Sequence, residues 1–96
     1  MPGYSMRQNY PNPFNPVTEI AFDLPSTSRV SMDVYNILGQ RVATLAEGEI
    51  FEAGSHALRF DGYALPSGVY FCRLSASLPG GIGEQFTQVK EMLLVK

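Results

Sequence analysis

The sequence has few of the residues on which catalytic and metal-binding sites are usually built. It contains no tryptophan, one cysteine and one histidine among 96 residues. A single cysteine, Cys72, can form neither an intrachain disulfide nor a cysteine-cluster metal site, so we expect an inert core residue. His56 is expected to be a packed or edge residue, because no spacing brings it a nucleophile and an orienting acid. Enzyme signatures such as Gly-x-Ser-x-Gly and His-Glu-x-x-His are also missing, so we predict no enzyme, cofactor or metal.

Charge and hydropathy exclude further classes of protein. The seven basic and nine acidic residues are scattered and give a net charge of -2, so no basic patch is available for nucleic acid. No stretch is long and apolar enough for a membrane span. Residues 1–6 lack a basic start followed by an apolar core, so they are not expected to be a signal peptide. We expect residues 1–7 to be a linker or a cloning remnant and residues 8–96 to form one domain.

Alternation of apolar and polar residues predicts short strands separated by turns. The strands that the pattern delimits are 17–24, 29–35, 41–46, 55–61, 65–74 and 85–95. The first two should either pair as a hairpin or bracket a change of sheet. Turn signals recur about every 8–12 residues, which predicts an all-β fold, an immunoglobulin-like antiparallel β-sandwich of about seven strands. Glu47–Gly54 is expected to be an acidic connection, and Ser75–Glu84 a long, glycine-rich and mobile hairpin tip.

The stretch Leu65–Leu74 should be the central strand. Its two faces are both largely apolar, which favours a strand that is covered on both faces. Tyr70 precedes Cys72 by two residues, the spacing of the tyrosine that anchors a strand to nearby backbone in immunoglobulin-type sandwiches. The last strand, 85–95, begins with alternation and ends in an apolar run. Its end should therefore also be buried on both faces.

The proline-rich stretch Gln8–Pro16 is predicted to be extended, with few ladder hydrogen bonds. Tyr10 and Phe14 should pack against the sandwich, and Asn12 and Asn15 should bond to their own local backbone. An ordinary linker is the alternative interpretation of this stretch.

Two weaker patterns leave other functions open. Glu47, Glu49 and Glu52 form either a weak cation site or, more simply, a solvated acidic loop. Aromatic residues expected in loops could bind a glycan by stacking, which makes a carbohydrate-binding or adhesive module the alternative function. Those aromatic residues are Tyr4, Tyr10, Phe14, Phe51 and Tyr63.

Four stretches in order resemble the motifs of the C-terminal sorting domains of the type IX secretion system (Por secretion), type A. They are Gln8–Pro25, Val34–Val42, the Gly-x-Tyr stretch Leu65–Phe71 and the ending Lys90–Lys96. The same pattern is similar to the immunoglobulin-like domain of flagellar hook-capping proteins. The chain departs from the family pattern in its longer glycine-rich loop and in having a cysteine at position 72.

The resemblance implies a non-enzymatic address on a larger secreted protein of a Bacteroidota-type bacterium. It implies an upstream cargo domain, the type IX translocon, a sortase-like surface peptidase and attachment to anionic lipopolysaccharide as partners. The cargo would cross the periplasm and end at the outer-membrane surface or outside the cell. The sorting-motif candidates that it implies are Pro11, Asn12, Pro13, Asn15, Pro16, Leu38, Gly39, Gln40, Gly68, Tyr70, Lys90 and Lys96.

Overall fold

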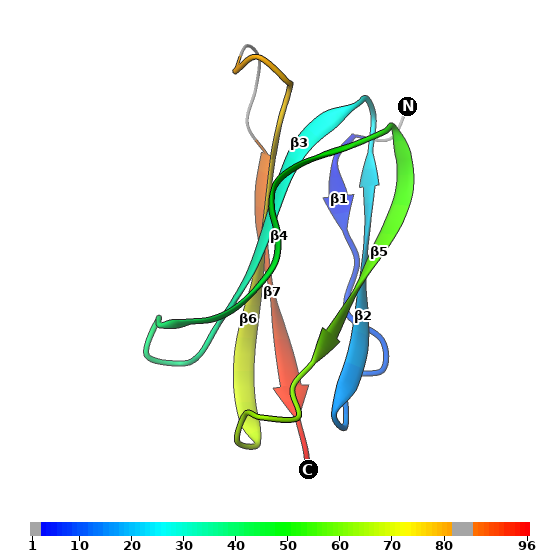
Figure 1. The fold of residues 1–96 in the computed structure, drawn as a ribbon. Coiled ribbons are helices and arrows are strands. Elements are labelled where there is room, and N and C mark those ends of the chain that lie inside the picture. Colours follow the sequence, from blue (N-terminus) through cyan, green and yellow to red (C-terminus); the bar gives the residue numbers. More distant parts are fainter. Residues whose placement is uncertain (1–2, 82–85) are drawn as a thin grey trace.

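The computed structural model describes residues 3–81 and 86–96, which form two β-sheets packed face to face (Figure 1). Within these residues the strands are β1 (Ser5–Met6), β2 (Val17–Leu24), β3 (Ser28–Tyr35), β4 (Arg41–Phe51), β5 (Gly54–Asp61), β6 (Gly68–Ser77) and β7 (Phe86–Leu94). One sheet has the order β1-β2-β5 and the other β4-β3-β6-β7, and all neighbouring strands are antiparallel. The predicted immunoglobulin-like sandwich is confirmed.

The core lies between the inner faces of the two sheets. In β2 the alternate residues Ile20, Phe22 and Leu24 are buried, as predicted, and β3 repeats the pattern. These two strands belong to different sheets, so their short connection changes sheet and does not close a hairpin. Full burial of one side chain of this size stabilises the fold by about 1.5–3 kcal/mol. The alternation of buried and exposed residues is therefore a strong determinant of the fold.

Strand β6 is central, between β3 and β7, and its inner residues Tyr70, Cys72 and Leu74 are buried. The expectation that both of its faces are covered is wrong. On the outer face Phe71 is half-buried and Arg73 is exposed, because no further layer of the described chain packs there. This apolar outer face is therefore available to another molecule.

Strand β4 continues through Phe51, so the prediction that Glu47 begins a connection is wrong. The pairing of β4 with β3 shifts register at several points. These irregularities accommodate residues of β4 that do not alternate between the two faces of the sheet. At Gly48, where φ is +61°, the backbone N–H donates to Ser31 Oγ at 2.9 Å, and Arg29 Nη1 donates to its carbonyl at 3.0 Å. The core residue of this strand is Ala46, whereas Val42 and Leu45 are only half-buried.

Strand β7 alternates to its end. Leu93 and Val95 are 39% and 47% exposed, so the expectation that the end of this strand is buried on both faces is wrong. Strand β6 extends through Ser77, which removes the first residues of the predicted 75–84 hairpin tip. Residues 82–84 of that tip, and the predicted strand start at residue 85, lie outside the described residues.

The first described residues also contact the sandwich. Ser5 and Met6 form β1 and pair with Asp23 and Phe22 of β2. The Met6 side chain is only 3% exposed and joins the core. The packed structure therefore includes residues that precede Gln8.

Candidate functional site

The proline-rich stretch lies along the end of β7. The Phe14 N–H donates to the Leu93 carbonyl at 2.9 Å, and the Val95 N–H donates to the Phe14 carbonyl at 3.0 Å. The Asn12 Oδ1 atom accepts a third bond from the Leu93 N–H at 3.0 Å. Because these bonds satisfy the otherwise open edge of β7, the stretch is a structural part of the sandwich and not an ordinary linker.

One of the two predicted aromatic contacts of this stretch forms. Phe14 is 1% exposed, and its ring packs against Phe60 with centroids 5.8 Å apart. Tyr10 is 82% exposed, so its predicted packing is wrong; its backbone bonds to Glu19 of β2, which directs the side chain outward. Asn12 was expected to bond locally but bonds to β7, which is distant in the sequence.

Gly62 joins the proline-rich stretch to the β5–β6 connection. Its N–H donates to the Pro16 carbonyl at 2.8 Å. A Cβ atom at this position would lie 3.1 Å from Leu94 Cδ2 and 3.4 Å from Phe14 Cε2. A larger residue would therefore fit here only if the Leu94 and Phe14 side chains shifted. Segments from three parts of the chain meet at this residue.

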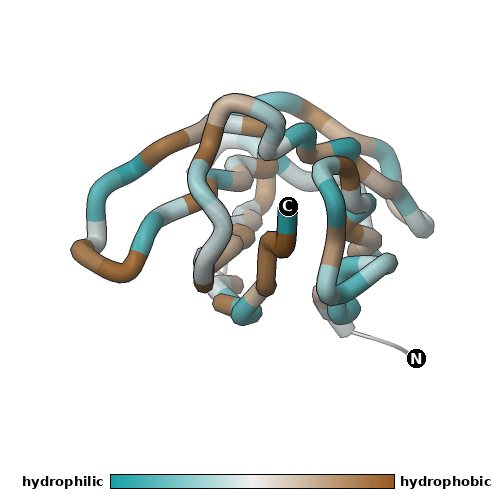
Figure 2. Tube along the Cα trace, turned by 90° about the horizontal axis from the view of Figure 1, so that it is seen from below, coloured by the Kyte–Doolittle hydropathy of each residue, from teal (hydrophilic) through white to brown (hydrophobic). Residues whose placement is uncertain are grey.

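The Lys96 side chain closes the same connection from the other side. Its ammonium donates to the carbonyls of Tyr63 and Leu65, the latter at 2.9 Å, and lies 5.4 Å from the centroid of the Tyr63 ring. Its backbone N–H donates to Ser67 Oγ at 2.9 Å. Figure 2 looks at this end of the molecule and shows the C-terminal end in the middle of the view, with loops around it.

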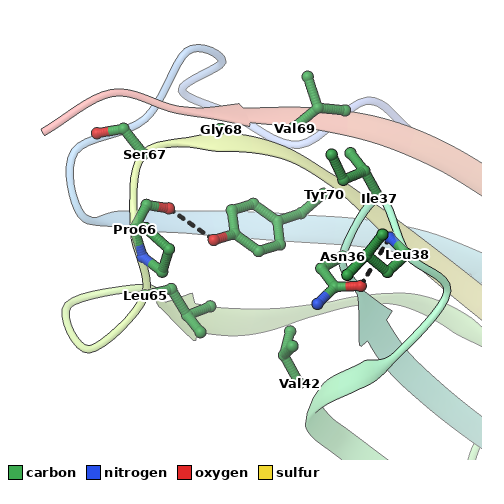
Figure 3. Close-up of a pocket in the computed structure, with 10 residues that line it drawn as sticks. All are labelled: Asn36, Ile37, Leu38, Val42, Leu65, Pro66, Ser67, Gly68, Val69 and Tyr70. Atoms are coloured by element: carbon green, nitrogen blue, oxygen red, sulfur yellow. Dashed lines mark hydrogen bonds between the residues drawn. The ribbon is translucent and has the colours of Figure 1, made fainter.

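The Tyr70 hydroxyl holds the connection from within the core. It donates to the Pro66 carbonyl at 2.6 Å, while its ring is 4% exposed (Figure 3). This is the anchoring bond that the Tyr70–Cys72 spacing predicts, so that prediction is confirmed. We name the connection Gly62–Ser67, with Phe14, Tyr70 and Lys96 bonded or packed around it, the motif junction.

The β3–β4 loop is held by Asn36. Its Oδ1 accepts from the N–H groups of Leu38 and Gln40 at 2.9 and 3.0 Å, which satisfies a tight turn with Gly39 at φ +79°. Leu38 and its neighbour Ile37 are 77% and 72% exposed. The turn thus presents two large apolar side chains to solvent.

A pocket of about 330 Å³ lies between this loop and the motif junction (Figure 3). Ile37, Leu38 and Val42 line it from the loop side, and Leu65–Tyr70 line it from the other. Strand β3 ends at Tyr35, which pairs with Phe71 of β6. The preceding residues of β6, Gly68–Tyr70, therefore have no partner in β3, and the pocket lies there. Its walls are mostly apolar, which suits an apolar group of a partner.

The structure brings most of the sorting-motif candidates to this end of the molecule. Gly68 and Tyr70 line the pocket together with Leu38, and Gly39 and Gln40 belong to the loop beside it. The candidates Pro11, Asn12, Pro13, Asn15 and Pro16 belong to the proline-rich stretch, and Lys96 to the motif junction. Lys90 does not join them: it is half-buried in β7, opposite Cys72.

Asn9 and Thr18 support the proline-rich stretch but were not predicted as site residues. Asn9 is 3% exposed, and its Nδ2 donates to Thr18 Oγ1 at 3.0 Å and to the Pro11 carbonyl at 3.1 Å. Thr18 Oγ1 donates to the same carbonyl at 2.8 Å. Prolines interrupt regular ladder pairing, so a carbonyl in this stretch, such as that of Pro11, takes its hydrogen bonds from side chains. A proline-rich stretch thus calls for polar side chains near it, but the sequence does not show which residues supply them.

Cys72 and His56 are both held in the packed structure. Burial, followed by the charge of Asp33, raises the pKa of the Cys72 thiol to about 12, which keeps it protonated and unreactive. His56 packs between Phe22 and Phe51, and its Nε2 lies 2.7 Å from the Glu52 carbonyl. Over residues 3–81 and 86–96, no three His, Cys, Asp or Glu side chains gather as metal ligands would.

No helix in the described part of the chain is long and apolar enough to cross a membrane. Of the five aromatic residues expected in loops, Phe14 is buried, Tyr4 and Phe51 are half-buried, and Tyr10 and Tyr63 are exposed. The two exposed rings lie on separate segments, Tyr10 on the proline-rich stretch and Tyr63 on the β5–β6 connection beneath Lys96.

Comparison with known proteins gives one family. The model of the secretion system C-terminal sorting domain matches residues 8–79, which include the first three of the four motifs. No curated protein matches the chain. The family is one of sorting signals and not of enzymes, and it implies a larger secreted protein that is exported across the outer membrane. The chain belongs to the family of C-terminal sorting domains of the type IX secretion system.

Proposed function

We propose that the type IX machinery recognises the motif junction together with the Ile37–Gln40 turn across the pocket. The observation that supports this is convergence: residues 12–14, 62–67, 70 and 93–96 bond to one another at one end of the sandwich. These contacts join residues far apart in the sequence, so the surface exists only in the folded domain. Recognition of this surface is therefore recognition of a completed fold.

The chemistry of this surface suits a protein partner. Ile37 and Leu38 are exposed beside an apolar pocket, and grouped exposed apolar side chains are typical of interaction sites. Lys96 adds positive charge at the margin. A partner segment with a bulky apolar side chain and acidic neighbours fits this arrangement.

The candidate residues divide into two roles under this proposal. Leu38, Gly39 and Gln40 form the surface that a partner touches. Those of the proline-rich stretch, with Gly68, Tyr70 and Lys96, hold that surface in place. Lys90 lies apart from both groups, and we assign it no contact with the machinery.

The proposal extends to the fate of the cargo. The cargo crosses the periplasm, and the folded domain directs it through the outer membrane. A sortase-like surface peptidase then removes the domain and joins the cargo to anionic lipopolysaccharide at the cell surface. Membership of the family supports export across the outer membrane, and attachment to the cell surface is the part of the proposal that goes further.

A reporter fusion tests the proposal. The whole chain is placed after a signal peptide and a reporter, in a host that has this secretion system. We expect the reporter at the cell surface, accessible to added protease, and in the periplasm when the domain is omitted. A reporter that stays periplasmic while the fused domain is folded would contradict the sorting role. A reporter released entirely into the medium would contradict only the attachment.

A further inference from the structure

The outer face of the four-stranded sheet carries two rows of side chains with a regular order of charge. Across β4, β3, β6 and β7, one row reads Arg41, Tyr35, Phe71, Glu91, as the strand registers place them. The first and last of these are exposed and the two aromatic residues are half-buried. The row thus has a positive end, an aromatic centre and a negative end.

The adjacent row has its charges at the centre. Across the same four strands it reads Thr44, Asp33, Arg73, Val89. Thr44 Oγ1 donates to Asp33 Oδ1 at 2.9 Å, which confirms that these two side chains share the outer face. Arg73 is exposed and Val89 is 52% exposed. Here a negative and a positive residue lie side by side on β3 and β6.

We propose that a second copy of this chain covers this face and forms a symmetric dimer. A two-fold axis that runs along the strands, between β3 and β6, places β6 of one copy over β3 of the other and β7 over β4. Phe71 then faces the partner's Tyr35, and both charged pairs become attractive: Arg41 faces Glu91, and Asp33 faces Arg73. Sheets that pack in this aligned way lie about 10 Å apart and cross at about 30°, which leaves these central rows in contact.

Three features favour a second copy over another occupant. The charge order is self-complementary about one axis, which an isologous interface requires and an unrelated partner does not. The apolar residues Val69 and Leu93 continue the aromatic centre in the next row, and both would be withdrawn from water. The outer side chains of β6 are partly or fully exposed in the single chain. Strand β6 nevertheless has apolar residues on both faces, the pattern of a strand that is covered on both sides.

Charge reversal tests the dimer without the secretion machinery, so its outcome is independent of the proposed function. The measurement is sedimentation equilibrium of the full chain over a wide concentration range. We expect a monomer–dimer equilibrium. Arg41→Glu and Glu91→Arg should each weaken it by at least about tenfold, because like charges then face each other. The double variant should restore it.

The matched control is the pair Glu19 and Arg59, which are exposed cross-strand neighbours of opposite charge in the other sheet. Glu19→Arg and Arg59→Glu should each leave the monomer–dimer equilibrium unchanged. Thermal unfolding should show that every variant is folded. A wild-type chain that stays monomeric would overturn the proposal and leave the face to the cargo or the machinery. A dimer that survives both single reversals, or is not restored by the double one, would also overturn it.

Discussion

The two ends of the sandwich are held together in different ways. At the motif junction, hydrogen bonds link the proline-rich stretch, the β5–β6 connection and Lys96. At the opposite end, contacts between aromatic rings join the two sheets: Tyr4 stacks on Phe86 at 5.4 Å, and Phe51 contacts His56 at 5.1 Å. Hydrogen bonds fix one geometry because they are directional, whereas packed rings tolerate replacement by apolar side chains of similar volume. The junction end is therefore the end that presents a defined shape.

The largest expected effect comes from removing the aromatic anchor of the junction. Phe14→Ala should lower the free energy of unfolding by about 3–5 kcal/mol, because the ring is fully buried and the proline-rich stretch loses its packing. Phe51→Ala, at the opposite end, should have a smaller effect, because that ring is half-buried. Urea unfolding compares the two. Equal losses would show that the ends do not differ in the way described.

The next effect tests the close packing at Gly62. Gly62→Ala should destabilise the domain by about 1–3 kcal/mol, because the new methyl group lies 3.1 Å from Leu94 Cδ2. Leu94→Val removes that contacting methyl. The two changes together should therefore be less harmful than the sum of the two separate losses in a double-mutant cycle. Strict additivity would show that the predicted contact does not limit the site.

A smaller effect isolates one hydrogen bond at each end. Tyr70→Phe removes the bond to the Pro66 carbonyl and should lower the free energy of unfolding by about 0.5–1.5 kcal/mol. Tyr4→Phe, the matched change, removes a 3.0 Å bond to Ser28 Oγ. The Tyr70 change should also speed amide exchange between Leu65 and Gly68, and the Tyr4 change should not. Unchanged exchange in the Tyr70 variant would contradict an anchoring role.

The smallest effect concerns pH and the pair Asp23 and Arg7, which lies away from the junction. Hydrogen bonds from Ser55 and Ser5, followed by the Arg7 guanidinium, lower the pKa of Asp23 from its ordinary 3.8. A carboxyl whose pKa is lowered by folding stabilises the fold above its ordinary pKa and loses this contribution as the pH falls through the lowered value. The melting temperatures of wild type and Asp23→Asn should therefore differ slightly at neutral pH and converge in acid below 3.8. A difference that persists at the lowest pH would contradict this origin.

Much of the fold could be predicted because alternation is a local property of the sequence. Strands β2, β3 and β5 follow directly from it. The continuation of β4 through Glu47–Phe51 could not be predicted in this way, because its irregular pairing depends on β3. The exposure of Phe71 was missed for a related reason: an apolar face does not reveal whether the layer that covers it belongs to the same chain.

The candidate site was predictable in its parts but not in its assembly. The Tyr70 anchor follows from local spacing, and the Asn36 turn from turn chemistry. That Asn12 bonds to Leu93, and Lys96 to Leu65, depends on tertiary structure, since these residues are far apart in the sequence. Asn9 and Thr18 were missed because a buried polar pair is recognised by its bonding partners, which the sequence does not show.

The most direct test of recognition at the junction end is the secretion of two reporter fusions that differ only in the end that is changed. Leu38→Asp places a charge beside the pocket, and Ile50→Asp places one on β4 toward the opposite end; both positions are exposed, at 77% and 51%. Their melting temperatures should match that of the wild type. We expect Leu38→Asp to leave the reporter in the periplasm and Ile50→Asp to be exported like the wild type. Equal export of the two folded variants would contradict recognition at the junction end.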